Sequence, residues 1–306
     1  MSSLKNVLLI GAGGNLGVPV LKAFLKAGTY NISVLARKES TSVFPDGVQV
    51  FKADYTNESE LHLAMKGQDV VISMVTGFAA GGQNILVDAA IAAGVKRFYP
   101  SEFGPPSRDA KFAALNHAVL PPKAATVDYL RTKEDQISWT SIVTGAFFDW
   151  ALEKGFMGLD VASRKAGLID GGASIFTACT LPYIADAILA SLEQADETKN
   201  QYVFIGEFNI SVKELLSAVE QVHGQKWTTE DLKSEDVAAN GEKLLAEGNF
   251  WGVTELTRAG AFGKHGLGDN RPWGLWDKKL GLQRSGLKQA IGDVLSRLGE
   301  PVVALD

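Results

Sequence analysis

The stretch LKNVLLIGAGGNLG, residues 4–17, joins a short apolar run to a glycine-rich turn and to the start of an amphipathic segment. The apolar run, residues 7–10, lacks helical spacing, which is typical of a strand buried on both faces of a parallel sheet. Residues 16–26 carry apolar side chains at helical spacing. The stretch therefore predicts a strand, a sharp turn and a helix.

The turn carries three glycines at regular spacing. Gly11 and Gly14 have no side-chain bulk and tolerate a positive φ, so a pyrophosphate can lie against the main chain. We expect Asn15 to cap the helix, and the first helical amides, at Leu16 and Gly17, to favour an anion placed before them. The turn thus predicts a dinucleotide phosphate site.

Composition excludes several classes of protein. The 306 residues are 46% hydrophobic, enough for a large core, and a net charge of −5 without a basic stripe argues against nucleic-acid binding. The single cysteine and the spacing of the four histidines predict neither a disulfide nor a metal site. No apolar run reaches the roughly 18 residues of a membrane span, and the start MSSLKN has no signal-peptide core. We expect a cytoplasmic monomer or homodimer that contacts no membrane.

Strand and helix patterns alternate along the chain. Strands are predicted at residues 32–35, 48–51, 69–74, 95–99, 137–143, 166–170 and 202–205, and helices at residues 58–65, 83–93, 121–132, 181–193, 212–222, 233–247 and 286–298. This order predicts an α/β fold with a doubly wound, mostly parallel Rossmann sheet. We expect an NADP-binding domain over residues 1–155 and, over residues 156–306, a smaller C-terminal substrate lobe interleaved with returning Rossmann elements.

The residues after the second strand indicate which dinucleotide binds. Sites that prefer NAD place Asp or Glu there to bond the ribose 2′-hydroxyl, whereas this chain has Arg37 and Lys38. Two cations suit a 2′-phosphate, which favours NADPH, although both could be solvated loop charges. Asp54, after the third strand, is either an adenine contact or a capping residue. The small residues from Val75 to Gly82 are typical of a loop that passes the cofactor.

The segments GAGGNLG, ADYTNESELHLAMKGQDVVIS and DAAIAAGVKRFYPSEFG resemble the NmrA-like branch of the atypical short-chain dehydrogenases, in particular isoflavone reductases and phenylpropanoid ether reductases. The later segment VLPPKAATVDYLRTKEDQISWTSIVTGAFFDWAL resembles the fungal isoflavone reductase-like members. The resemblance covers about the first 155 residues. It implies that the general acid or base is a lysine in the helix after the SEFG loop, a position that Lys123 matches.

The surroundings of Lys123 are compatible with that role. Pro121 and Pro122 place Lys123 in the first turn of a helix, beside the edge of the sheet where open α/β folds bind ligands. The helix dipole disfavours a cation there, and partial desolvation would lower the lysine pKa further. Such a lysine can exchange a proton near neutral pH, whereas the alternative is a surface lysine after two prolines.

A second proton donor is also available in the sequence. Tyr129 and Lys133 have the Y-x-x-x-K spacing of ordinary short-chain dehydrogenases, with Ser101 as the serine partner. Six residues at 100° each rotate Tyr129 by about 240° from Lys123 on a continuous helix, so both cannot face one nicotinamide. We expect Lys123 to be the catalytic residue.

Aromatic and small residues follow the fifth and sixth strands. The resemblance implies that the loop after the sixth strand covers the nicotinamide. Gly145 would permit close backbone approach, and Phe147 and Phe103 would be opposing walls, unless both rings are core. The candidate substrate contacts are His117, Phe148 and Trp150, although Phe148 also suits the core and a lone histidine is usually structural.

These features predict an NADPH-dependent reductase of a small aromatic or conjugated carbonyl compound. Hydride would pass to an electrophilic carbon while Lys123 manages the proton of the substrate oxygen. A non-catalytic NADP(H)-binding redox sensor of the NmrA type is the alternative, and an isomerase or epimerase is a third possibility. The aromatic, glycine-containing stretch 262–281 has no clean period and could be a lid, a subunit contact or a core edge.

Overall fold

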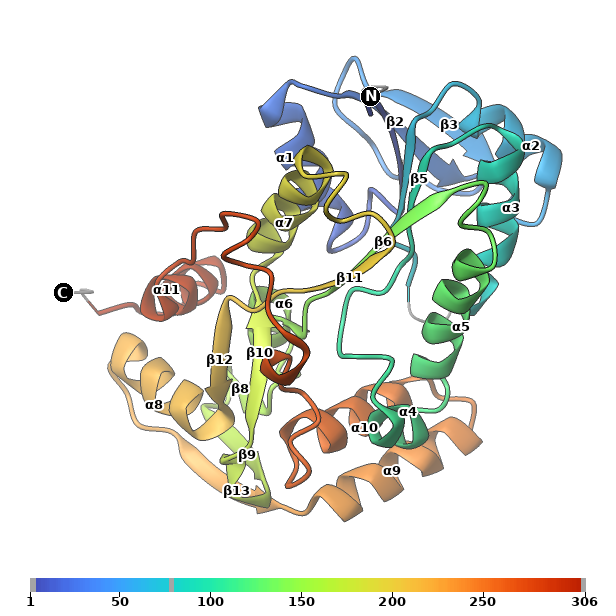
Figure 1. The fold of residues 1–306 in the computed structure, drawn as a ribbon. Coiled ribbons are helices and arrows are strands. Elements are labelled where there is room, and N and C mark those ends of the chain that lie inside the picture. The colour runs from blue at the N-terminus through green and yellow to red at the C-terminus, as the bar shows by residue number, and fades with distance from the viewer. Residues whose placement is uncertain (1–3, 77–79, 304–306) are drawn as a thin grey trace.

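A parallel sheet forms the central layer of the molecule (Figure 1). Within residues 4–76 and 80–303, which the computed structural model describes, its seven strands lie in the order β11 (Gln201–Phe204), β6 (Ser138–Val143), β5 (Arg97–Tyr99), β4 (Val70–Ser73), β1 (Asn6–Ile10), β2 (Asn31–Arg37) and β3 (Gln49–Ala53). Neighbouring strands are parallel. The strand order reverses between β1 and β4, the position at which open α/β folds bind ligands.

Helices cover both faces of this sheet. They are α1 (Gly17–Ala27), α2 (Glu58–Met65), α3 (Asn84–Ala92), α5 (Leu120–Arg131) and α7 (Leu181–Glu193). Val7 and Leu9 of β1 pack with α1 and α7, whereas Leu8 and Ile10 pack with α2, α3 and α5. Successive side chains of a strand point to opposite faces, so an apolar strand without polar positions is covered on both sides. The predicted doubly wound α/β fold is confirmed.

A smaller lobe follows the sixth strand (Figure 1). The lobe contains two three-stranded sheets. The strands of one lie in the order β12 (Phe208–Ser211), β10 (Ile175–Cys179) and β7 (Ala146–Phe147), and those of the other in the order β13 (Thr228–Leu232), β9 (Lys165–Ile169) and β8 (Leu159–Asp160). The helices of this lobe are α6 (Phe148–Glu153), α8 (Val212–His223), α9 (Ser234–Ala246), α10 (Trp251–Phe262) and α11 (Leu287–Arg297), together with α4 (Ala110–Leu115), which comes before the sixth strand in the chain. Short 3₁₀ turns along the chain are η1 (Ala80–Gly82), η2 (Asp170–Gly172) and η3 (Arg271–Trp273). One hydrophobic cluster, which includes Phe148, Phe176 and Phe262, holds this lobe together.

The aromatic stretch 262–281 lies along an edge of the central sheet. Trp273 stacks on Phe204 of β11 with ring centroids 5.3 Å apart, and the Trp276 amide donates to the Phe204 carbonyl at 2.8 Å. Of the three alternatives for this stretch, these contacts favour a core edge.

The predicted loop from Val75 to Gly82 is described at both of its ends. Residues 77–79 within it, like residues 1–3 of the MSSLKN start, lie outside the described residues.

None of the helices within the described ranges combines the length and the apolarity that a membrane crossing requires.

Candidate active site

Loops from five parallel strands meet at the carboxyl edge of the sheet. They are residues 11–14 after β1, 38–44 after β2, 74–76 after β4, 101–105 after β5 and 144–145 after β6. Two hollows lie along this edge: a cleft of about 300 Å³ above β1 and β2, and an aromatic cavity of about 140 Å³ beyond β5 and β6. This is the edge at which ligands bind in open α/β folds.

The glycine-rich turn forms the floor of the first cleft. The Gly14 amide donates to the Gly11 carbonyl at 3.0 Å, and Gly11 has a φ of +81°. A Cβ at Gly11 would lie 2.6 Å from the Met74 carbonyl oxygen, and one at Gly17 would lie 2.1 Å from the Gly11 carbonyl oxygen. A Cβ at Gly14 would meet only the Gly11 carbonyl, at 3.2 Å. Gly11 and Gly17 are therefore required by the turn itself, whereas the exposed Gly14 leaves the approach to the backbone open.

The expectation that Asn15 caps α1 is wrong. The N-cap residue is Leu16, which has helical φ and ψ values of −79° and −36° and no side-chain hydrogen bond to the helix. A capping side chain acts from an extended N-cap residue, one position after Asn15. Of the first amides of α1, that of Val18 donates to the Gly14 carbonyl at 3.1 Å, and Pro19 has no N–H, so among the described residues the Leu16 and Gly17 amides remain available to an anion at the turn.

Only one of the two predicted cations lines the cleft. Arg37, at the end of β2, lines it, and none of the described residues pairs with its guanidinium. Lys38 Nζ instead donates to Glu60 Oε1 at 2.6 Å and points to α2. The cleft therefore fits a dinucleotide with one extra phosphate, because it offers a glycine turn, free helix amides and an unpaired guanidinium.

Asp54 is not the capping residue of α2, and it is not among the residues that line the cleft. Its carboxylate accepts hydrogen bonds from the Thr56 amide at 2.9 Å and the Thr56 hydroxyl at 2.7 Å, which lower its pKa. Asn57 caps α2 by accepting from the Glu60 amide at 3.2 Å. Asp54 thus closes the turn before α2 and does not line the cleft.

The sequence patterns missed several residues of this cleft. They lie in the β2–β3 loop and after β3, and they are Ser40, Ser42, Phe44 and Tyr55. The β2–β3 loop has no periodic pattern, so nothing in the sequence assigned it to the cleft.

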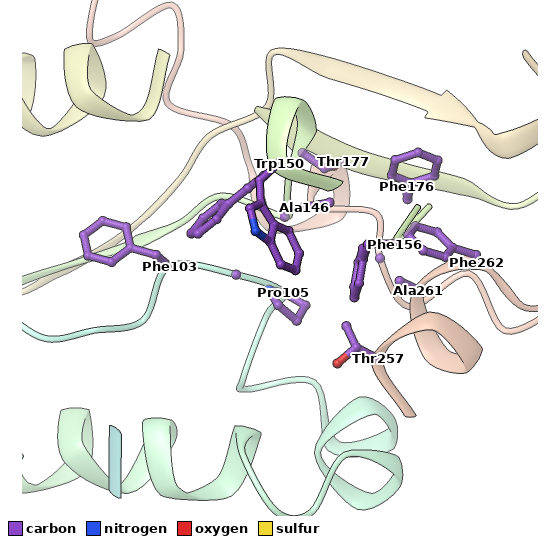
Figure 2. Close-up of a pocket in the computed structure, with 14 residues that line it drawn as sticks. Phe103, Pro105, Ala146, Trp150, Phe156, Phe176, Thr177, Thr257, Ala261 and Phe262 are labelled. Carbon is purple, nitrogen blue, oxygen red and sulfur yellow. The ribbon is translucent and has the colours of Figure 1, made fainter. Parts of the chain in front are cut away.

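The second hollow is lined almost wholly by aromatic and small side chains (Figure 2). Figure 2 shows the indole of Trp150 between the loop that carries Phe103 and Pro105 and the rings of Phe156 and Phe262. No charged side chain is among the 14 residues that line it. Such a cavity fits a planar, uncharged group.

The two hydroxyl groups of this cavity are already engaged. Thr177 Oγ1 donates to Asn209 Oδ1 at 2.8 Å and accepts from the Asn270 amide at 2.8 Å. Thr257 Oγ1 donates to the Val253 carbonyl at 2.8 Å. By contrast, none of the described residues accepts a hydrogen bond from the indole N–H of Trp150, which lies on the side of the ring nearer to Phe103 in Figure 2. Trp150 is therefore the free side-chain donor of the cavity.

Lys123 lies beneath the loop that lines the cavity. Its side chain is 6% exposed, and Nζ donates to the carbonyl oxygens of Glu102 at 3.3 Å and Phe103 at 3.1 Å. A Cβ on Gly104, a lining residue, would be 3.4 Å from Nζ. Burial lowers the pKa of Lys123, and the Glu102 carboxylate opposes that shift. The amine therefore lies buried against the backbone of the loop that lines the cavity, with a pKa that burial lowers.

The alternative proton donor faces away from this loop. The Tyr129 hydroxyl donates to Asp88 Oδ1 of α3 at 2.5 Å, and Lys133 Nζ lies 5.3 Å from the Tyr129 ring centroid. The Ser101 hydroxyl donates to the Val75 carbonyl at 2.7 Å. Tyr129 and Lys133 thus lie together but apart from Ser101, because the helical rotation that brings Lys123 to the loop turns Tyr129 toward α3.

The structure places the candidate residues His117 and Phe148 outside the cavity and Gly145 in its lining. His117 is exposed and pairs with Glu242 of α9 at 3.2 Å, away from the cavity. Phe148 is fully buried in the lobe core, with its ring centroid 4.8 Å from that of Phe208. Gly145 lines the cavity, but its φ of +67° and a Cβ position 2.1 Å from the Thr177 carbonyl oxygen show that β10 is its close neighbour. Of the aromatic candidates, Phe103, Phe147 and Trp150 line the cavity.

A family model described as "NmrA-like family" matches residues 3–243. The chain belongs to the NmrA-like family. This NmrA-like chain is 35% identical over 254 residues to Oxidoreductase aprR of Aspergillus flavus. The matched region covers 82% of this chain and 85% of that protein. It is 33% identical over 254 residues to Oxidoreductase poxI of Penicillium oxalicum, with coverage of 81% and 79%. It is 30% identical over 251 residues to Isoflavone reductase homolog IRL of Zea mays, with coverage of 77% and 80%.

Solved structures share the fold of this NmrA-like chain. A leucoanthocyanidin reductase from Vitis vinifera, in a binary complex with NADPH, has a TM-score of 0.79 and 19% identity, over 95% of this chain and 99% of that one. An isoflavone reductase structure has a TM-score of 0.74 and 20% identity, with the same coverage. The resemblance to isoflavone reductase-like proteins is confirmed, as is the prediction of an oxidoreductase.

Proposed function

We propose that this chain is an NADPH-dependent reductase of a small, uncharged aromatic or conjugated carbonyl compound. The observation that carries the proposal is that Lys123 Nζ lies against the backbone of Phe103, the loop residue that lines the aromatic cavity. Ser101 of the same loop donates its hydroxyl to the carbonyl of Val75 at 2.7 Å, and Val75 lines the dinucleotide cleft. The proton donor, the cavity and the dinucleotide cleft are therefore linked through one loop.

The cofactor assignment is supported by the cleft and by relatives of the same fold. Gly11 and Gly14 with the first amides of α1 would hold the pyrophosphate, and Arg37 would bind the 2′-phosphate. The leucoanthocyanidin reductase of similar fold was solved with NADPH. When bound, the nicotinamide supplies the hydride.

The substrate class follows from the lining of the cavity. Phe147 and Trp150 offer flat apolar surfaces, and the Trp150 indole offers a hydrogen-bond donor to a substrate oxygen. A carboxylate or phosphate would lose its hydration here without gaining a counter-charge from the lining. Lys123 would give a proton to the substrate oxygen or to the atom conjugated with it.

NADPH oxidation measured against a panel of phenylpropanoids, quinones and enones tests this proposal. We expect turnover with at least one uncharged aromatic member and none with its carboxylated analogue. If NADPH binds tightly but no member of the panel is reduced, the redox-sensor alternative replaces the reductase. A pull-down for a partner protein whose binding depends on the cofactor then follows.

A further inference from the structure

A buried carboxylate lies behind the proposed proton donor. Glu102 is fully buried, and neither of its carboxylate oxygens has a hydrogen-bond partner among the described residues. The amide and hydroxyl of Ser107 face this carboxylate and lower its pKa, but neither makes a hydrogen bond of normal geometry to it. A carboxyl group in such a place is costly unless a nearby charge compensates it.

Lys123 supplies that compensating charge. Burial raises the pKa of Glu102 to about 7, and the Lys123 ammonium is the strongest influence that lowers it. The reciprocal effect raises the pKa of Lys123 against its own burial. An ammonium has three N–H donors, and the carbonyl oxygens of Glu102 and Phe103 accept two of them. Among the described residues, the third N–H of Lys123 has no hydrogen-bond acceptor.

The other charged groups around Glu102 are neutralised elsewhere. Arg108, in the loop before α4, also lowers the pKa of Glu102, but its guanidinium is paired with Asp128 of α5. Arg108 Nε donates to the Tyr202 hydroxyl of β11 at 3.1 Å, and burial raises the pKa of Tyr202 to about 12. Arg108 and Asp128 thus form a separate ion pair, and Lys123, at longer range than an ion-pair contact, is the remaining cation that acts on the Glu102 carboxylate.

We propose that Glu102 is a positioning residue of the reduction: its buried carboxylate keeps Lys123 as an ammonium, aimed at the aromatic cavity by the carbonyls of Glu102 and Phe103. This inference rests on the proposed function. In the step it serves, the substrate carbon gains a hydride and is reduced by two electrons while the dinucleotide is oxidised. One Nζ–H bond breaks, an O–H bond forms on the substrate, and the neutral amine regains its proton from water.

A thermodynamic cycle at pH 8 tests the charge pair without any substrate or cofactor. Glu102→Gln, Lys123→Met and the double variant are compared with the wild type by thermal unfolding. Each single variant leaves one charge buried alone, so the double variant should unfold at a higher temperature than Lys123→Met. Additive effects of the two substitutions would overturn the pair.

The pH dependence of unfolding provides a second readout. The pKa of the Glu102 carboxyl is about 7 in the folded protein and 4.5 in the unfolded chain, so between these pH values the folded protein binds more protons. The contribution of Glu102 to the free energy of unfolding therefore falls as the pH rises from 4.5 to 7. Glu102→Gln should remove this fall, whereas Glu58→Gln, at an exposed position on α2, should keep it. A wild-type pH profile in Glu102→Gln would contradict the inference.

The pH profile of kcat distinguishes positioning from a purely structural role. With NADPH and 9,10-phenanthrenequinone as the probe, Glu102→Gln should move the alkaline limb to lower pH by at least one unit, because Lys123 loses its counter-charge. A uniform loss of kcat with an unmoved limb would overturn the positioning role. If the wild type reduces neither this quinone nor any member of the panel, the proposed function is contradicted instead. The unfolding cycle needs no substrate, so it tests the interaction of Glu102 with Lys123 separately from the proposed function.

Discussion

Lys123 Nζ donates a hydrogen bond to the Phe103 carbonyl at 3.1 Å. This contact joins the first turn of α5 to the loop after β5, two segments that are 20 residues apart in the chain. Phe103 lines the aromatic cavity, and Ser101 of the same loop donates to the carbonyl of Val75, which lines the dinucleotide cleft, so the loop that Lys123 contacts borders both hollows. The predictions below test this arrangement.

Arg37→Ala should weaken NADPH binding by about tenfold or more and leave NADH binding nearly unchanged, since one charge-assisted phosphate contact accounts for roughly 1.4 kcal/mol. Lys38→Ala is the matched control, because Lys38 pairs with Glu60 and does not line the cleft. Calorimetric titration of both cofactors into both variants measures the difference. Equal losses of NADPH affinity in the two variants would show that Lys38 also reaches the phosphate.

Gly14→Val should abolish cofactor binding while the protein keeps a melting temperature close to that of the wild type. Its side chain would point where the pyrophosphate approaches, and its Cβ meets only the Gly11 carbonyl at 3.2 Å. Gly17→Ala, in contrast, should destabilise the fold by about 1–3 kcal/mol, because its Cβ would overlap the Gly11 carbonyl. Titration and thermal unfolding are run on both variants. Normal cofactor binding by Gly14→Val would mean that the glycine segment is an ordinary turn.

Phe148→Ala and Phe147→Ala should differ in what they damage. Phe148 is fully buried in the lobe core, so its truncation should cost about 3–5 kcal/mol of unfolding free energy. Phe147 is half-buried and lines the cavity, so its truncation should cost less stability and act chiefly on KM. Denaturant unfolding combined with steady-state kinetics separates the two. The assignment of Phe147 to the cavity fails if its loss leaves KM unaltered for every substrate that the wild type accepts.

Tyr129→Phe should retain reductase activity. The substitution deletes only the hydroxyl that bonds Asp88 on the outer side of α5, with a cost of about 1 kcal/mol in unfolding free energy. Steady-state kinetics and thermal unfolding check both parts. An inactive Tyr129→Phe would indicate the ordinary short-chain dehydrogenase mechanism.

Most of the central sheet could be predicted from the sequence, because its strands are apolar on both faces and its helices carry regular apolar spacing. Helix α2 at Glu58–Met65 and helix α7 at Leu181–Glu193 have the predicted bounds. Helix α10 was missed because two glycines interrupt its apolar pattern, and these residues, Gly252 and Gly260, pack closely on α9 and Phe112. Tertiary contacts decide such a helix, and local periodicity does not.

The site was predicted unevenly for a related reason. The positions of Gly11 and Lys123 follow from local signals, namely a turn after a strand and two prolines at a helix start. The surroundings of Lys38 and His117 depend on Glu60 and Glu242, which are distant in sequence and reach them through folding alone. The burial of Glu102 is likewise invisible in SEFG, a polar-looking loop segment.

The measurement that tests the central claim most directly compares Lys123→Met with the wild type in two assays on the same preparations. Turnover with the best substrate of the panel should fall by a factor on the order of 10² to 10⁴, because the proton donor is lost. The Kd for NADPH, measured by calorimetry, should change little, because Lys123 bonds only the carbonyl oxygens of Glu102 and Phe103 among the described residues. Turnover close to that of the wild type, with NADPH still bound, would contradict the account.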